Sequence, residues 1–212
     1  MNLRSCLLSM VLIFVISHST TAQIVKGWKQ LGGVIGVQSS TSKNEATGAE
    51  TSTTYVQVNP SIGKFYANNR VAGVDLIYFG GFNKDVPDNH SIGGGVFLRQ
   101  YKPIGKSNLY VFLHERATLL FGKFFNAVAS DYIPMKSTSV ALTVVPGMTY
   151  AVTRQLQVDL LIPDIGTLQY IHSKPKDKTA DASLNTKQFT FRTGISENLF
   201  GNVSVGVRWL FK

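Results

Sequence analysis

The sequence predicts an all-β protein, a membrane-embedded up-and-down antiparallel β-barrel with eight strands. Three observations favour this fold class. From Gly27 onward, short segments alternate apolar side chains with glycine or polar ones, which is the period of a strand with two different faces. Short and long connections alternate along the chain, with one of the long loops expected around residues 124–136, as in an up-and-down barrel. Aromatic residues gather near the ends of the expected strands.

The first segment has the pattern of a secretory signal peptide. Arg4 precedes an apolar run, Leu7 to Ile16, which is shorter than the ~20 residues that a membrane-spanning helix needs. Small residues then lead to an expected cleavage after Ala22. The chain therefore divides into a signal peptide, residues 1–22, and one barrel domain, residues 23–212. No cysteine follows Ala22, so an exported domain would hold together without disulfides.

The charge of the chain is strongly basic. Lys and Arg number 21 against 12 Asp and Glu, a formal net charge of +9. Basic proteins often bind nucleic acid, but an exported chain rarely meets any, and these lysines do not gather on one helical face. We therefore expect no nucleic-acid partner, and we expect the lipid of an outer membrane, with its anionic headgroups, to supply the counter-charge.

The alternating faces predict the strands in chain order. The apolar faces of the first four are Leu31, Ile35 and Val37; Val56, Val58 and Ile62; Val74, Leu76 and Tyr78; Ile92, Val96 and Leu98. In several of these strands the opposite face holds glycine or polar residues, although Val34, Ile77 and Phe97 also lie on opposite faces. A weak internal repeat relates residues 58–76 to residues 144–160 and places Asp75 and Asp159 on equivalent, non-apolar faces. We expect Pro60 and Pro146 at bulges or near the membrane interface, because proline breaks a ladder hydrogen bond.

The closing segment sets the strand count. Odd positions from Phe189 to Phe211 are mostly apolar, even positions are mostly small or polar, and the parity never slips. We interpret it as one long strand whose residues Val203 to Phe211 cross the membrane, with Glu197 outside the bilayer. Splitting it into a hairpin would give nine strands, whereas bacterial single-chain barrels have even numbers.

Alternation alone leaves open which face points inward. An inward apolar face would make a periplasmic ligand-binding barrel with an apolar cavity. An outward face is favoured by the glycine-rich opposite face, since eight strands leave room only for side chains, and by two aromatic girdles. The girdle near the short turns is Trp28, Tyr66, Tyr150, Trp209 and Phe211, and the one near the long loops is Tyr78, Phe79, Phe82, Phe121 and Tyr170.

Residues 58–81, 93–115, 144–161 and the terminal "GVRWLF" together resemble the small outer-membrane β-barrel proteins widespread in Bacteroidetes, similar in architecture to OmpX and the OmpA barrel. The resemblance covers almost all of the chain after the signal peptide. It implies a Gram-negative outer membrane and recognition of a terminal aromatic residue by the outer-membrane barrel assembly machinery. Here Lys212 follows Phe211, and the added lysine is expected to weaken that recognition.

The inward face carries a predicted lumen charge network of Asp75, Arg99, Asp159, Arg192 and Arg208. These residues could form an ion pathway, but pairing that seals a narrow lumen is favoured, because unpaired buried charges are costly. If the third hairpin is centred near Pro87, Asp75 lies across from Arg99. Glu115 and Arg116 fall on opposite faces, so one of them must face lipid unless a bulge shifts the register.

Chemistry-bearing residues are sparse. His90, His114 and His172 follow the signal peptide, and the neighbours Ser91 and Ser173 point to opposite faces of their strands. We therefore predict no catalytic, cofactor-binding or metal-binding residue, and leave a rim enzyme that modifies lipid A as the weaker alternative. The favoured function is a non-enzymatic barrel, structural or surface-interacting through its long loops. Lys174, Lys176 and Lys178 in one such loop are candidates for contact with lipopolysaccharide phosphates.

Overall fold

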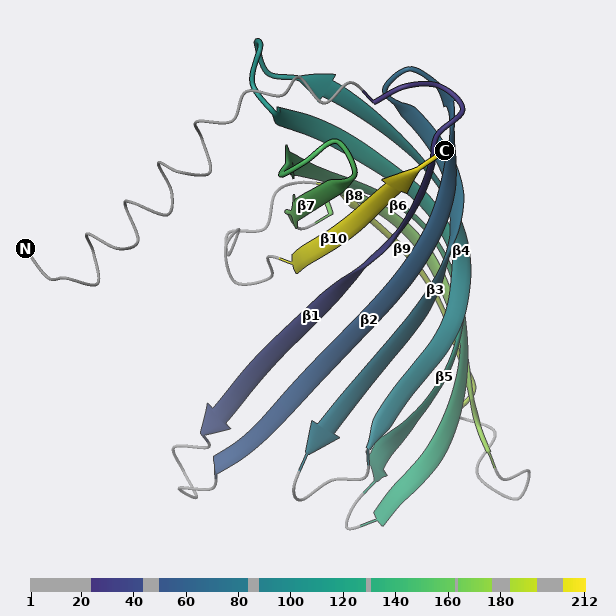
Figure 1. Ribbon diagram of the computed structural model, residues 1–212. Helices are drawn as coiled ribbons and strands as arrows, with labels where there is room; N and C mark the ends of the chain where they lie inside the picture. Colours follow the sequence, from purple (N-terminus) through teal and green to yellow (C-terminus); the bar gives the residue numbers. More distant parts are fainter. Residues whose placement is uncertain are drawn as a thin grey trace, which may run out of the picture.

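A computed structural model describes residues 24–43, 50–83, 88–128, 131–162, 164–176, 184–193 and 204–212 (Figure 1). The predicted signal peptide and Glu197 lie outside these ranges. The strands are β1 Lys29–Lys43, β2 Glu50–Ala67, β3 Arg70–Asn83, β4 Asn89–Pro103, β5 Leu109–Val128, β6 Asp131–Ala151, β7 Leu156–Leu161, β8 Gly166–Pro175, β9 Thr186–Thr193 and β10 Ser204–Phe211. The described residues contain no helix that is long and apolar enough to cross a membrane.

The strands close into an antiparallel ring with eight positions. β1 to β6 pair in chain order, and β6 then pairs with β7 along its turn-end part and with β8 along its loop-end part. β10 lies between β7 and β1 and closes the ring, and β9 pairs with β8. β7 with β8, and β9 with β10, therefore fill one position each. The predicted all-β, up-and-down antiparallel fold with eight strand positions is confirmed.

The closing segment keeps its parity across both of its described parts. Phe189 and Phe191 on β9 and Val205 and Val207 on β10 are all more than half exposed. Their sequence numbers are all odd, so the two parts present the same face to the outside. This is the face that the alternation predicted for a single long strand.

Two expectations about irregularities had mixed outcomes. Pro146 lies where β6 exchanges β7 for β8, and the amides of Ile162 and Ile165 bond the carbonyls around it, at Pro146 and Val144. Pro60 instead pairs in regular register with Gly33 of β1, and the bulge in β2 falls near Ala67. The long loop expected around residues 124–136 is also wrong, because β5 and β6 remain paired as far as Val128 and Asp131.

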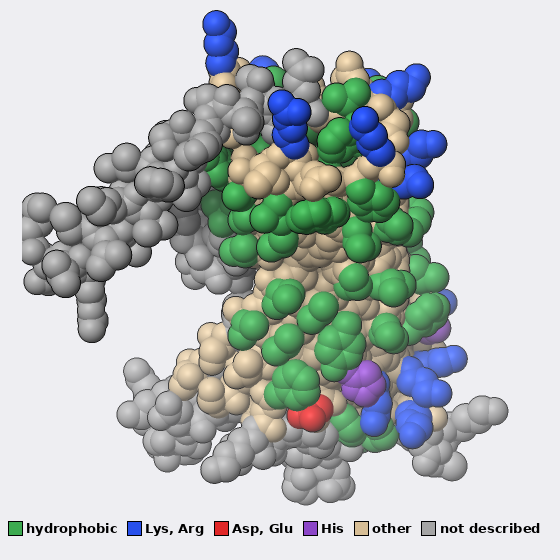
Figure 2. All heavy atoms as spheres, viewed as in Figure 1, with side chains coloured by type: hydrophobic (Ala, Val, Ile, Leu, Met, Phe, Trp, Pro, Cys, Tyr) green, Lys and Arg blue, Asp and Glu red, His purple; other side chains and the backbone are tan. Residues whose placement is uncertain are grey.

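The apolar faces of the strands point outward. Val74 and Val205 are 52% and 51% exposed, and the other members of the predicted apolar faces are likewise exposed, except Val56, which is half-buried. Figure 2 shows these side chains over the middle of the molecule, with Lys and Arg side chains towards both ends. Because the aliphatic side chains line the outside, the alternative of a barrel with an apolar ligand cavity is wrong.

The inside of the barrel at the short-turn end is filled by an apolar plug. We use this name for the buried cluster of Ile24, Phe65, Val71, Phe97, Tyr101, Tyr110, Phe112, Ala151 and Leu210. Glycine makes room for it: a Cβ on Gly73 would lie 2.2 Å from the Ile62 carbonyl oxygen and 2.6 Å from the Phe97 ring. This plug was not predicted from the sequence, which indicated a lumen sealed by polar and charged groups alone.

Candidate functional site in the barrel lumen

A buried charge cluster lies beside the apolar plug. Its centre is Asp159 on β7, whose Oδ2 accepts hydrogen bonds from Arg99 Nη1 at 2.6 Å and from Arg208 Nε. Thr149 Oγ1 donates to the other carboxylate oxygen at 2.7 Å. The side chains of Arg99 and Asp159 are 0% exposed and that of Arg208 is 2% exposed, so the three charges are almost inaccessible to bulk solvent.

The strand parity brings these residues together. Asp159 and Arg208 occupy inward positions on neighbouring strands, where Asp159 faces Gly206 and Arg208 faces Gln157. The missing side chain of Gly206 leaves space beside the carboxylate, because a Cβ there would lie 3.3 Å from Asp159 Cβ. Arg99 reaches Asp159 from β4, across the width of the lumen.

The Arg99 guanidinium is held on several sides. Its Nε donates to His114 Nδ1 at 3.1 Å, and its Cζ lies 4.1 Å from the centre of the Phe112 ring. The His114 ring stacks on Phe97 with 5.0 Å between ring centres. Charge–aromatic contacts of this kind stabilise a cation away from water. His114 therefore belongs to the cluster, although sequence reasoning weighed it only as a possible catalytic residue.

Asp75 forms a second ion pair, but with Arg116 of β5, at 3.2 Å. The predicted pairing with Arg99 is wrong, because Asp75 lies opposite Gly95 and Arg99 lies opposite Val71. Gly95 explains the exchange of partners: a Cβ there would lie 2.8 Å from Asp75 Oδ1. With no side chain on β4 in the way, Arg116 reaches Asp75 from the next strand.

Arg192 lies apart from the buried cluster. It pairs with Asp164 at 3.8 Å, where the two side chains are 68% and 37% exposed. Asp164 also accepts a hydrogen bond from the Thr167 hydroxyl. Of the predicted network, the structure thus brings Asp159, Arg99 and Arg208 into direct contact, places Asp75 in a separate pair, and leaves Arg192 at the rim.

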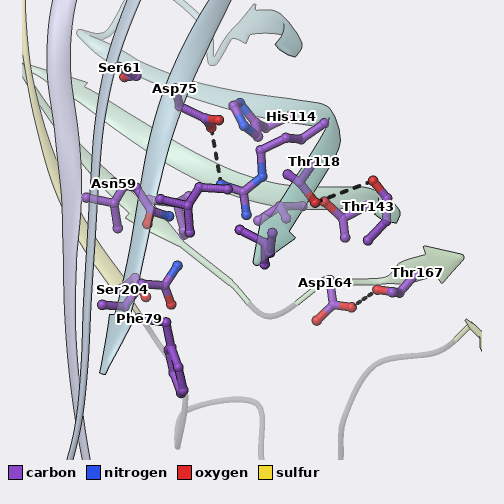
Figure 3. Close-up of a pocket in the computed structure, with 18 of the residues that line it drawn as sticks. Asn59, Ser61, Asp75, Phe79, His114, Thr118, Thr143, Asp164, Thr167 and Ser204 are labelled. Atoms are coloured by element: carbon purple, nitrogen blue, oxygen red, sulfur yellow. Dashed lines mark hydrogen bonds and ion pairs between the residues drawn. The ribbon is translucent and has the colours of Figure 1, made fainter. Parts of the chain in front are cut away.

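A cavity of about 370 Å³ occupies the lumen on the loop side of the plug. Figure 3 shows side chains from several strands around it, with Asn59, Asp75 and His114 converging on one region and Asp164 beside Thr167 in another. Arg99, Arg116, Arg192 and Arg208 line this cavity together with Asp75 and Asp164. The cavity reaches solvent near Arg192, since that side chain is mostly exposed.

The predicted girdle residues fall in different environments. At the turn end, Tyr66 and Trp209 are 45% and 49% exposed. Tyr150 and Phe211 are half-buried, and Trp28 packs against the apolar plug. At the loop end, Phe79 lines the cavity and stacks on Tyr55 with 5.5 Å between ring centres, so it does not belong to an outer girdle. Tyr78, Phe82, Phe121 and Tyr170 are exposed.

Glu115 faces outward in the middle of the apolar band. Its neighbours across β4 and β6 are Leu98 and Val144, both pairings stay in register, and Arg116 points into the lumen. The ambiguity at this strand is therefore settled without a bulge. No ion-pair partner for Glu115 occurs in the described residues.

We expect Glu115→Leu to stabilise the protein in a bilayer by about 1–2 kcal/mol, because a lipid-facing carboxylate is destabilising, though less so than a basic residue. Urea unfolding in lipid vesicles would measure the change, with Glu115→Gln as an intermediate case. A clear loss of stability on Glu115→Leu would contradict this placement.

The remaining histidines lie apart from the cluster. His90 is exposed near the loop end, and His172 bonds Asn185 Oδ1 at 2.9 Å. Ser173 is buried on the opposite face of β8 from His172. Among the residues described, no group of three His, Cys, Asp or Glu side chains could hold a metal ion.

The fold and the site define a class: a closed antiparallel barrel with an aliphatic outside and a charged lumen plugged at the turn end. No family model and no curated protein matches the chain. Among solved structures, it is similar to Neisserial surface protein A, with 19% identity over 88% of this chain and 98% of that chain, and a TM-score of 0.47. At that score the likeness carries no argument about function, and the relation to the Bacteroidetes barrels stays a prediction.

Proposed function

We propose that this protein is a non-enzymatic outer-membrane β-barrel that interacts with its surroundings through the loop end while its lumen stays closed. The observation that carries the proposal is the continuous outward aliphatic band. More than thirty large apolar side chains are exposed, far beyond the patches that a monomer in water exposes. A barrel with this outside is stable only where lipid is the solvent.

The charged residues at the turn end of the barrel support one orientation of the barrel in the membrane. The turn end carries Lys26, Lys29, Lys64, Arg70, Lys102, Lys106, Arg154 and Lys212, all exposed. No acidic residue occurs in the described turn-end segments 24–30, 63–71, 101–110, 149–157 and 208–212. Short turns face the periplasm in outer-membrane barrels, so this basic rim would lie at anionic headgroups of the inner leaflet.

The loop end would face the exterior. Lys174 and Lys176 are exposed there, which supports lipopolysaccharide phosphates as one surface partner, while Lys178 lies outside the described residues. Fractionation of inner and outer membranes, with heat-modifiable gel mobility of the extracted protein, tests the location. Recovery in the soluble periplasmic fraction would contradict the proposal.

The filling of the lumen supports a barrel that does not form an open pore. The apolar plug fills the turn end, and beside it the side chains of Asp159, Arg99 and Arg208 are at most 2% exposed. We expect purified protein in planar bilayers to show no steady conductance on the scale of a porin. Stable large channels would mean that the lumen is open, and the closed-lumen part of the proposal would be wrong.

A rim enzyme stays the weaker candidate. The separate positions of His90 and His172 and the opposite faces of their serine neighbours support a non-enzymatic role. Deletion of the gene is expected to leave the lipid A profile in mass spectra unchanged. A lost lipid A species that returns with the wild-type chain, but not with His90→Ala or His172→Ala, would favour the enzyme.

A further inference from the structure

Among the described residues, the buried part of the lumen carries more positive than negative charge. Arg99 and Arg208 share the single carboxylate of Asp159, and Arg116 is matched by Asp75. His114 Nδ1 accepts a hydrogen bond from Arg99, so that nitrogen carries no proton. In the described part of the chain, one cationic charge is thus left over on Arg99, Arg208 and Asp159, whose side chains are at most 2% exposed.

Two guanidinium nitrogens in the same region lack a partner. Arg99 Nη2 and Arg116 Nε are buried and make no hydrogen bond within the described residues. Arg99 itself is 1% exposed. Buried donors normally have partners, and charged ones most of all. Both arginines line the cavity of about 370 Å³, which is several times the volume that one water requires.

Water in the cavity could accept hydrogen bonds from the free guanidinium nitrogens, but it would leave the surplus positive charge uncompensated. In a barrel surrounded by lipid, the low dielectric strengthens the field of an uncompensated cation. An anion in the cavity would satisfy the free guanidinium nitrogens and cancel the surplus charge. Asn59 Oδ1 and Asp75 Oδ1 also lack partners on the cavity wall, so the anion must be small enough to leave water between itself and these oxygens.

We propose that the lumen contains a binding site for one small monovalent anion, a halide or a short carboxylate, held by Arg99 and Arg116. The site rests on the proposed function only through the low dielectric of the surrounding lipid, and it does not depend on what the loop end contacts. It also differs from a conducting pathway, since the apolar plug closes the turn end behind it.

Bromide gives a direct probe. Crystals of the folded protein in sodium bromide are expected to show an anomalous peak beside Arg99 and Arg116. In detergent, the unfolding temperature is expected to rise with sodium bromide and to saturate. Asn59→Asp adds a carboxylate to the cavity wall with almost no change of shape, and should abolish both the peak and the saturable rise.

Asn68→Asp makes the same chemical change on an exposed turn and is the matched control. It should respond to bromide as the parent does, because it leaves the lumen unchanged. A lumen filled only by water in the bromide crystals, or an equal response of Asn59→Asp and the parent, would overturn the proposal. A bromide peak that is unaltered in Asn59→Asp would identify an adventitious ion only, and would also overturn it.

Discussion

Asp159→Asn is expected to lower the free energy of unfolding by about 3–5 kcal/mol, as removal of one member of a buried ion pair does. The amide would leave Arg99 and Arg208 facing each other without a carboxylate, in a site where neither is solvated. Urea unfolding in lipid vesicles, followed by tryptophan fluorescence or by the heat-modified gel band, would measure the loss.

Two further substitutions of lumen carboxylates provide a comparison for the loss of stability in Asp159→Asn. Asp75→Asn should destabilise less, because its partner Arg116 keeps 18% of its side chain exposed and can be partly hydrated. Asp164→Asn removes a carboxylate of the exposed rim pair and should change stability by no more than about 0.5 kcal/mol. Equal effects for all three would mean that the lumen is wet throughout.

Val74→Arg is expected to destabilise the barrel in vesicles by about 2–4 kcal/mol, the range for a basic residue at the middle of the bilayer on the lipid face. Val74 lies between Ile62 and Val96 of the neighbouring strands, well inside the aliphatic band. Tyr66→Arg places the same side chain on the same face near the turn end and should cost about 0–1 kcal/mol. A flat response with depth would contradict the membrane placement.

The faces of the strands could be predicted because strand parity is a local property. Within each alternating segment, such as Leu31 to Val37 or Val203 to Phe211, the sequence alone shows which side chains lie on the same face. The ring of eight positions also followed, since alternate short and long connections admit few other topologies. Even the two halves of the closing segment keep a shared outward face in β9 and β10.

The partners of the lumen charges could not be predicted in the same way. They depend on the register of each hairpin, and a small shift of the turn moved the residue opposite Asp75 from Arg99 to Gly95. Arg116 became the partner because Gly95 leaves a gap that only the assembled sheet reveals. The plug was missed for a related reason: Phe97 and Tyr101 are inward on a face otherwise judged polar, and their meeting with Phe65 and Phe112 requires closure of the ring.

The outward direction of the apolar faces is the central claim, and nitroxide labels at Val74 and Val205 test it most directly. In lipid vesicles, both labels should collide readily with oxygen, which dissolves in the bilayer, and rarely with a water-soluble nickel complex. A label at the exposed turn-end residue Lys64 should show the reverse. Protection of Val74 and Val205 from both reagents would place them in a dry protein core and would contradict the account.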